Sequence, residues 1–438
     1  MKSNKRVLII THDFYNNCAK VGYMIRMTQL ANYFVDESIE VNVLACKKNK
    51  TWNGLLKLNP KVNVKFIKSY WNYKSTSSFE TNTILNKKST MNTFPKKVLK
   101  SLFQLFLSNY LIDRHQLTNR RYINEAKLMI VNKKINNILV SGPRNSIYLV
   151  GVQLKKEFGP KVNIITDYRD GWTVRDAFYR GKPQKTINKF KIIEQKILNY
   201  NDYSVFTSDR LKKAYEDEFN VKRSLVIENG FIEYSNSSKK PQLEFQKVIE
   251  KARNENRIVI GYFGTGSAEG SRTDKNFSNL LLAFESNPSL ANRFCLVSQG
   301  NVTYPENTPN ALMIKNLVGT SNEEARSNMR LIDVLLFVYS RINDAPMIMG
   351  GKVYDYIATG KPIWLLVPNN AFSLKAFVAR TGKPILTDIN ESESIVKSLK
   401  DIIRLHEKGE LAKKGFSYEE ASLYTRVNQY KKFLDILM

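Results

Sequence analysis

The stretch 258–266 reads Ile-Val-Ile-Gly-Tyr-Phe-Gly-Thr-Gly, an apolar run that leads directly into two closely spaced glycines. A short apolar run of this kind predicts a buried parallel strand, and the glycines predict a tight turn after it. Glycine also lets backbone N–H groups approach a phosphate closely. The signal is weak alone, because any strand-to-helix turn can carry glycine. It nevertheless makes Gly264, Thr265 and Gly266 candidate phosphate-binding residues.

The same pattern recurs outward from this stretch, with short apolar runs separated by amphipathic segments of helical length. Such alternation predicts parallel strands in βαβ units, and two such series predict two doubly wound, Rossmann-like domains of the α/β class. The first-half runs are 7–10, 41–45, 64–67, 138–140, 162–166, 203–207 and 224–227, and the second-half runs are 258–263, 294–298, 311–315, 334–339 and 363–367.

The domain boundary is expected near 233–255, where the polar segment Ser-Asn-Ser-Ser-Lys-Lys-Pro carries no strand pattern. The predicted domains are therefore 1–240 and 255–417. The remaining segment, 418–438, predicts a terminal helix that packs back across both domains.

Charge is concentrated in the first half of the chain. The formal net charge is +28, of which residues 1–240 carry +24, from 43 basic and 19 acidic residues. This asymmetry indicates a polyanionic partner such as nucleic acid, an anionic membrane face or a phosphate-bearing substrate. A generally lysine-rich composition is the alternative. The basic amphipathic insertion 87–125 fits a membrane-facing helix and, equally, a helix packed on the core.

Three cysteines lie far apart, so neither a disulfide framework nor a metal knuckle is indicated. The start of the chain lacks the apolar stretch of a signal peptide, and no run of about 18 apolar residues occurs. We therefore expect a cytoplasmic protein.

A second motif follows at 346–362, which reads Pro-Met-Ile-Met-Gly-Gly-Lys-Val-Tyr-Asp-Tyr-Ile-Ala-Thr-Gly-Lys-Pro. Gly350 and Gly351 precede a helical stretch and predict free N–H donors at a helix start. Asp355, one turn later, is placed to accept hydrogen bonds from ribose hydroxyls. Arg272 and Lys275 suit a diphosphate, whose negative charges need neutralising, although a solvated pair on a loop is the alternative.

This motif resembles the donor signature of the retaining family 4 glycosyltransferases, which have the GT-B fold. Lys352, Asp355, Gly360 and Pro362 match a pattern that there reads Lys-x-x-Glu-Tyr-x-x-x-Gly-x-Pro. Asp355 stands where the family has a ribose-binding Glu, and Met347 replaces the Glu eight residues earlier. The resemblance implies two domains that face each other across a cleft, with a C-terminal helix crossing back.

The N-terminal half is similar to the same family, with a strand and loop at 7–13 followed by the helix that carries Arg26. The element Asp167-Tyr-Arg169-Asp170-Gly-Trp172 resembles one found in members that build bacterial surface polysaccharides. The resemblance implies that Arg26 and Arg169 hold an anionic acceptor. Asp170, Asp13 and His12 are candidate bases near the acceptor hydroxyl, but a structural histidine and an Asp170–Arg169 ion pair are the alternatives.

The resemblance implies retaining transfer of a sugar from a nucleotide-diphosphate donor to a lipid-linked or other glycan acceptor. Arg272 and Lys275 would then stabilise the leaving diphosphate in place of a metal ion, so the resemblance implies that neither a metal nor another cofactor is used. Val318 would present backbone groups to the base. Binding to an anionic membrane face on the inner side of the plasma membrane would fit the charge. Three alternatives stay open: a nucleic-acid-binding or DNA-glucosylating protein, a sugar-nucleotide epimerase and a non-catalytic scaffold. The sequence names neither the donor sugar nor the oligomeric state.

Overall fold

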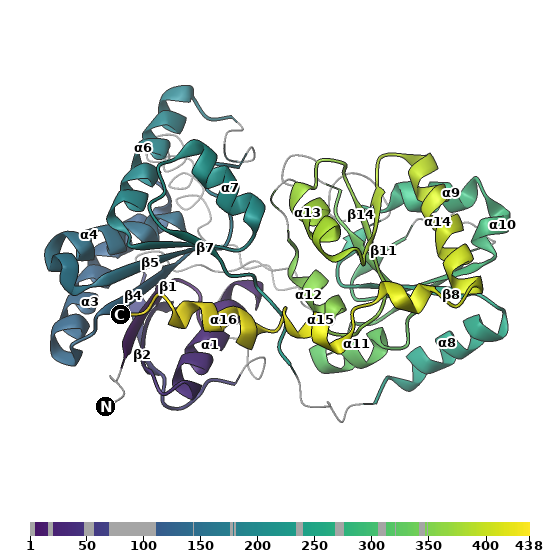
Figure 1. The fold of residues 1–438 in the computed structure, drawn as a ribbon, viewed down its shortest axis with the longest axis horizontal. Helices are drawn as coiled ribbons and strands as arrows, with labels where there is room; N and C mark the ends of the chain where they lie inside the picture. The colour runs from purple at the N-terminus through teal and green to yellow at the C-terminus, as the bar shows by residue number, and fades with distance from the viewer. Residues whose placement is uncertain are drawn as a thin grey trace, which may run out of the picture. The chain divides into compact units, whose positions relative to one another are not determined.

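The structure is a computed structural model that describes residues 5–15, 21–47, 57–69, 111–142, 144–175, 178, 181–233, 240–267, 276–304, 312–319, 321–340, 347 and 349–438. The chain forms two compact units (Figure 1). Unit 1 comprises Met1–Thr207, Leu211–Ile227 and Lys432–Met438, and unit 2 comprises Ser208–Arg210 and Glu228–Lys431.

Unit 1 is built on a seven-stranded parallel sheet in the order β3-β2-β1-β4-β5-β6-β7. The strands are β1 Arg6–Thr11, β2 Glu40–Lys47, β3 Asn63–Lys68, β4 Asn137–Ser141, β5 Asn163–Tyr168, β6 Tyr203–Phe206 and β7 Ser224–Val226. The helical segments are α1 Val21–Asp36, η2 Arg114–Thr118, α3 Asn119–Lys133, η3 Asn145–Ile147, α4 Tyr148–Phe158, η4 Gly159–Lys161, α6 Gln184–Tyr200 and α7 Asp209–Glu218.

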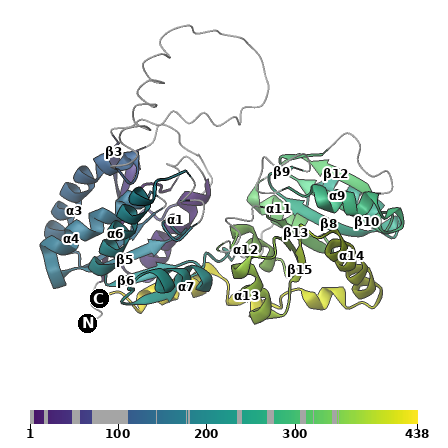
Figure 2. The same ribbon diagram turned by 90° about the horizontal axis from the view of Figure 1, so that it is seen from above.

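Helices cover both faces of this sheet. Helices α3, α4 and α6 lie side by side on one face (Figure 2). Helix α1 lies on the other face with α16 (Arg426–Leu434), where the ring centroids of Phe34 and Phe433 are 6.1 Å apart. The strand order reverses between β1 and β4, which is the position where open α/β sheets bind ligands at the carboxyl ends of the strands.

The last residues of the described chain are held at the amino ends of β4 and β5. Asn163 donates to the Ile436 carbonyl at 2.7 Å, and Asn137 accepts from the Met438 backbone N–H at 2.7 Å. Lys5 adds a hydrogen bond to the Leu437 carbonyl at 2.8 Å. Residues 432–438 therefore belong to unit 1 through specific polar contacts.

Unit 2 is built on a six-stranded parallel sheet in the order β12-β10-β8-β13-β14-β15, with a small β11-β9 pair beside it. The strands are β8 Ile258–Phe263, β9 Gly266–Ser267, β10 Phe294–Gln299, β11 Val302–Thr303, β12 Met313–Leu317, β13 Val334–Val338, β14 Ile363–Val367 and β15 Ile385–Asp388. The helical segments are α8 Leu243–Asn254, α9 Ser278–Glu285, α10 Pro288–Ala291, α11 Asn322–Met329, α12 Gly351–Ile357, α13 Phe372–Thr381, α14 Ser392–Glu407, η6 Leu411–Lys414 and α15 Tyr418–Ser422.

Two apolar cores sandwich the sheet of unit 2, because successive side chains of a strand point to opposite faces. On β14, Ile363 and Leu365 pack into the core beneath α8, α11, α12 and α13. Trp364 and Leu366 pack into the core beneath α9, α10 and α14. This confirms the prediction of buried parallel strands in two doubly wound units.

The terminal segment differs from the single helix that was expected. It forms α15 and α16, separated by a break at 423–425. The break follows from backbone pairing, because Phe231 N–H donates to the Tyr424 carbonyl at 3.0 Å and Arg426 N–H donates to the Phe231 carbonyl at 2.8 Å. These bonds take backbone groups that a continuous helix would use internally.

Within the described part of the chain, no helix combines the length and apolar character needed to cross a bilayer. The insertion 87–125 falls largely outside the described residues; only η2, α3 and the turn before them belong to its described portion.

Candidate functional site

The turn after β8 in unit 2 is built from backbone packed against backbone. Gly264 has a φ of +129° and Gly300, after β10, has a φ of +134°, values that favour glycine. A Cβ atom on Gly300 would overlap the carbonyl group of Gly264. The Gly264 N–H donates to the Gln299 carbonyl at 2.8 Å, which ties the two strand ends together.

Lys352 brings a positive charge to this turn from the first turn of α12. Its Nζ donates to the Phe263 carbonyl and lies 5.3 Å from the centroid of the Tyr262 ring. A Cβ atom on Gly264 would overlap the Lys352 ammonium, so the absence of a side chain there is what admits the lysine. The structure thus joins two residues that the sequence placed in separate motifs.

The other donor-site candidates in this region have defined hydrogen bonds or packing contacts. Thr265 accepts a hydrogen bond from the Tyr262 hydroxyl at 2.5 Å through its carbonyl, and Gly266 N–H donates to Asn301. Gly350 is the N-cap of α12, where a Cβ would come 2.7 Å from the Phe337 ring, whereas a Cβ on Gly351 would meet nothing within 4 Å. Packing on β13 therefore requires glycine at position 350 and leaves position 351 sterically open.

Asp355 and Val318 have partners that sequence reasoning did not find. Arg326 on α11 donates to the Asp355 carboxylate at 2.7 Å, with the arginine side chain 16% exposed. Val318 is 86% exposed, and its carbonyl accepts from the Gln299 side chain at 3.3 Å. Arg326 carries no motif in the sequence, so only the fold reveals its pairing with Asp355. Arg272 and Lys275 lie outside the described residues.

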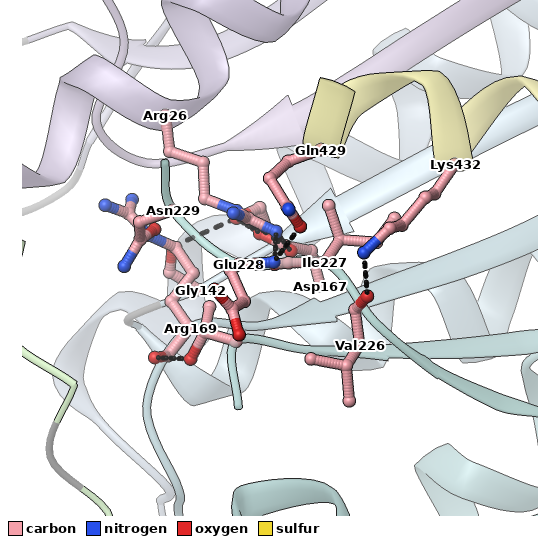
Figure 3. A network of polar contacts seen from close by, with 12 residues as sticks. Arg26, Gly142, Asp167, Arg169, Val226, Ile227, Glu228, Asn229, Gln429 and Lys432 are labelled. Carbon is pink, nitrogen blue, oxygen red and sulfur yellow. Dashed lines mark hydrogen bonds and ion pairs between the residues drawn. The ribbon is translucent and has the colours of Figure 1, made fainter. Parts of the chain in front are cut away.

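At the carboxyl edge of the sheet in unit 1, Arg26 and Asp167 form a buried ion pair (Figure 3). Arg26 Nη2 lies 2.8 Å from Asp167 Oδ1 and also donates to the Ile227 carbonyl at 2.9 Å. Ser141 donates to the second carboxylate oxygen at 2.8 Å. The side chains of Arg26 and Asp167 are 2% and 0% exposed, so their charges compensate each other inside the unit.

His12 and Asp13 follow β1 at the same edge and are both buried. The His12 ring lies 4.9 Å from that of His115 and 5.4 Å from that of Tyr122. Tyr122 donates to the Thr11 carbonyl at 3.2 Å, and burial raises the pKa of its hydroxyl well above the usual value. His115 joins this cluster from a distant segment, and no sequence pattern marked it.

Glu194 on α6 holds the segment that follows Asp170. Its carboxylate accepts from the backbone N–H and the hydroxyl of Thr173, and from the Tyr215 hydroxyl at 2.5 Å. Burial raises the pKa of Glu194 to about 7, although these hydrogen bonds act in the opposite direction. The carbonyl of Arg169 accepts from Thr207, and Asp170 is exposed. The predicted element at 167–172 therefore comprises the last two residues of β5 and the start of the loop after it, which Thr207 and Glu194 anchor.

In the described part of the chain, no group of three or more His, Cys, Asp or Glu side chains is placed to hold a metal ion. The candidate residues instead lie at the carboxyl edges of the two sheets, which differ in composition. Unit 2 presents glycine backbone with a lysine, and unit 1 presents polar loops supported by buried charges.

No protein-family model and no curated protein matches the sequence. Solved structures do match over nearly the whole chain. A structure from E. coli, described as trehalose-6-phosphate bound with UDP-2-fluoro glucose, has a TM-score of 0.61 at 11% identity, with 99% of each chain covered. A glycosyltransferase from Rickettsia africae gives 0.59 at 13% identity, with 99% of this chain and 98% of that chain covered.

An α,α-trehalose-phosphate synthase (UDP-forming) from Burkholderia vietnamiensis gives a TM-score of 0.55 at 11% identity, with 99% of each chain covered. At such identities the likeness concerns the fold. Together with the two parallel sheets and their helices, it identifies the fold of this chain as the two-domain α/β fold called GT-B.

Proposed function

We propose that the chain is a glycosyltransferase that moves a sugar from a nucleotide-diphosphate donor to an acceptor hydroxyl. The observation that carries this proposal is the Lys352 ammonium lying against the Gly264 turn at the carboxyl end of β8. Such a turn gives a phosphate access to backbone, and the lysine supplies the opposite charge. The GT-B fold and the UDP-2-fluoro glucose named for the E. coli neighbour support a nucleotide sugar as the donor.

In this proposal, departure of the diphosphate is the step that needs stabilising, because negative charge develops on it. Lys352 contributes one positive charge, and Arg272 and Lys275 contribute two more, as their resemblance to the family 4 pair implies. Val318 receives the base and Asp355 the ribose. Retention at the anomeric carbon and a metal-independent reaction belong to the same resemblance.

The acceptor is assigned to unit 1, at the carboxyl ends of β1, β4 and β5. His12, Asp13 and Arg169 follow these strands, and exposed Asp170 is the candidate base. Arg26 is assigned to the same site, where its pairing with Asp167 supports the end of β5, two residues before Arg169. Glu194 supports the loop through its hydrogen bond with Thr173.

A lipid-linked glycan acceptor, used in bacterial surface-polysaccharide synthesis, fits the charge of the first half of the chain. Residues 1–240 carry a net charge of +24, which favours an anionic membrane face. Flotation with liposomes tests this part. Binding to anionic vesicles should exceed binding to neutral vesicles and fall with added salt; equal binding to both would remove the membrane from the proposal.

The donor assignment is tested by thermal shift against a panel of nucleotide sugars, since a ligand that binds only the folded state raises the melting temperature. One nucleotide sugar should stabilise the wild-type chain. Lys352→Gln should weaken its binding by about tenfold or more, because a charge-assisted contact is lost.

Lys397→Gln is the matched control, because Lys397 is an exposed lysine of α14 in the same unit. It should bind the donor as the wild type does. Equal donor binding by Lys352→Gln and the control would remove Lys352 from the site. Turnover by Arg272→Ala and Lys275→Ala, expected to fall by orders of magnitude, tests the remaining two cations.

A further inference from the structure

A cavity of about 310 Å³ lies in unit 2 beside the carboxyl end of α12, away from the turn that carries Lys352 at the start of that helix. Helices α11 and α15 contribute the other walls. Its lining includes the buried apolar side chains of Phe231, Ile357 and Phe416. The volume is at the lower end of the range typical of small-molecule sites, about 300–1,000 Å³.

Two arginines of α11 line this cavity. Arg326 and Arg330 are four residues apart and therefore lie on one face of the helix end. Arg326 is held by Asp355, which is not part of the lining. Among the residues that the structure describes, the Arg330 guanidinium makes neither a hydrogen bond nor an ion pair, so its donors are available to a ligand.

Two carboxylates also line the cavity, and each is stabilised by a different neighbouring group. Glu233 accepts a hydrogen bond from the exposed Tyr418 hydroxyl at 3.1 Å. Glu323 lies in the first turn of α11, where the helix N-terminus favours negative charge. Among the charged side chains that line the cavity, Arg330 is the one for which the described residues provide neither a hydrogen bond nor an ion pair.

We infer that this cavity is a second ligand site, for a small organic anion. Arg326 and Arg330 would hold its phosphate or carboxylate group, because the planar guanidinium matches both groups with paired N–H donors. Its carbon body would lie on Phe231, Ile357 and Phe416. The ligand would contact none of the predicted donor residues, since none of them lines the cavity.

Arg326 is shared between this cavity and Asp355, so the ligand and the Asp355 carboxylate compete for one guanidinium. Removing the carboxylate charge should therefore strengthen ligand binding. A second consequence rests on the proposed function: a ligand that takes Arg326 releases Asp355 toward ribose, so the two ligands should assist each other reciprocally.

The test is isothermal titration of the full chain with phenyl phosphate, benzoate and inorganic phosphate. We expect one equivalent of phenyl phosphate or benzoate to bind, about tenfold more tightly than inorganic phosphate because the ring is buried against these apolar side chains. Benzoate distinguishes a carboxylate site from a phosphate site. Binding of neither aromatic anion would overturn the inference.

Variants locate the binding. Arg330→Gln, at an exposed position, should weaken it about tenfold, and Arg330→Lys should recover part of the loss. Asp355→Asn should strengthen it. Lys352→Gln, at the other end of α12, should leave it unchanged. Unchanged affinity in Arg330→Gln, or loss of binding in Lys352→Gln, would place the anion elsewhere and overturn the inference.

Discussion

The strand ends at the carboxyl edges of the two sheets are held in place in different ways. In unit 1 the end of β5 is fixed by side chains, with Arg26, Asp167 and Ser141 joined in a buried network. In unit 2 the ends of β8 and β10 are fixed by backbone, with Gly264 and Gly300 packed against each other. A buried charge network holds a loop, but its charged groups are paired with each other and do not face a ligand. A glycine turn leaves room for a cation such as Lys352.

The largest effect on stability is expected when the positive charge of Arg26 is removed. Arg26→Met leaves the Asp167 carboxylate buried without its partner, which should cost about 3–5 kcal/mol of unfolding free energy. Denaturant unfolding of the variant measures the loss. Arg26→Met combined with Asp167→Leu should recover part of it, because no lone charge remains. A loss below about 1 kcal/mol in the single variant would contradict a structural role for the pair.

The corresponding change in unit 2 is Gly300→Ala. A Cβ at this position overlaps the Gly264 carbonyl, and the φ of +134° disfavours a side chain. We expect a loss of about 3 kcal/mol, measured by thermal unfolding. Gly351→Ala is the control, since its Cβ would meet nothing within 4 Å and its effect should be within about 1 kcal/mol. Equal effects at both positions would mean that close backbone approach does not fix this edge.

Glu194 refines the contrast by making unit 1 sensitive to pH. Its pKa is raised to about 7 in the folded chain from an ordinary value near 4.5, so the folded state binds the proton more tightly than the unfolded state. This contribution to stability is complete at low pH, declines as the pH rises through that interval and stays constant above about 7. Between about pH 5 and 7 the decline should be on the order of 2 kcal/mol.

Glu194→Gln removes the titrating group and keeps hydrogen-bonding atoms near Thr173 and Tyr215. The unfolding free energy of the wild type, relative to this variant, should therefore fall across that pH interval. Glu393→Gln, at an exposed position of α14, serves as the control and should follow the wild type. Parallel pH curves for the wild type and Glu194→Gln would contradict the raised pKa.

The fold could be predicted from the sequence because each apolar run that forms a strand is a local pattern. All twelve predicted apolar runs form strands, and 258–263 and 363–367 have the observed bounds. β15 was missed because Ile385 and Leu386 are its only apolar residues and it lies at the sheet edge. In the site, the glycines and Lys352 were visible in their motifs, but their contact was not.

Pairings between distant residues escaped prediction for a physical reason. Arg26 and Asp167 are 141 residues apart, and neither residue type indicates its partner. The same holds for Arg326 with Asp355 and for His115 with His12. Whether a charged side chain faces a ligand or another side chain is decided by tertiary packing, which single-sequence patterns do not contain.

The anchoring of residues 432–438 by Asn137 and Asn163 has a consequence for synthesis. A chain emerging from the ribosome has every strand of unit 1 available early, yet the closing contacts of that unit come from its last-made segment. Unit 2, completed at Lys431, is finished first, although domains are generally completed in the order in which they are translated. The half that is begun first on the ribosome is thus the half that is finished last.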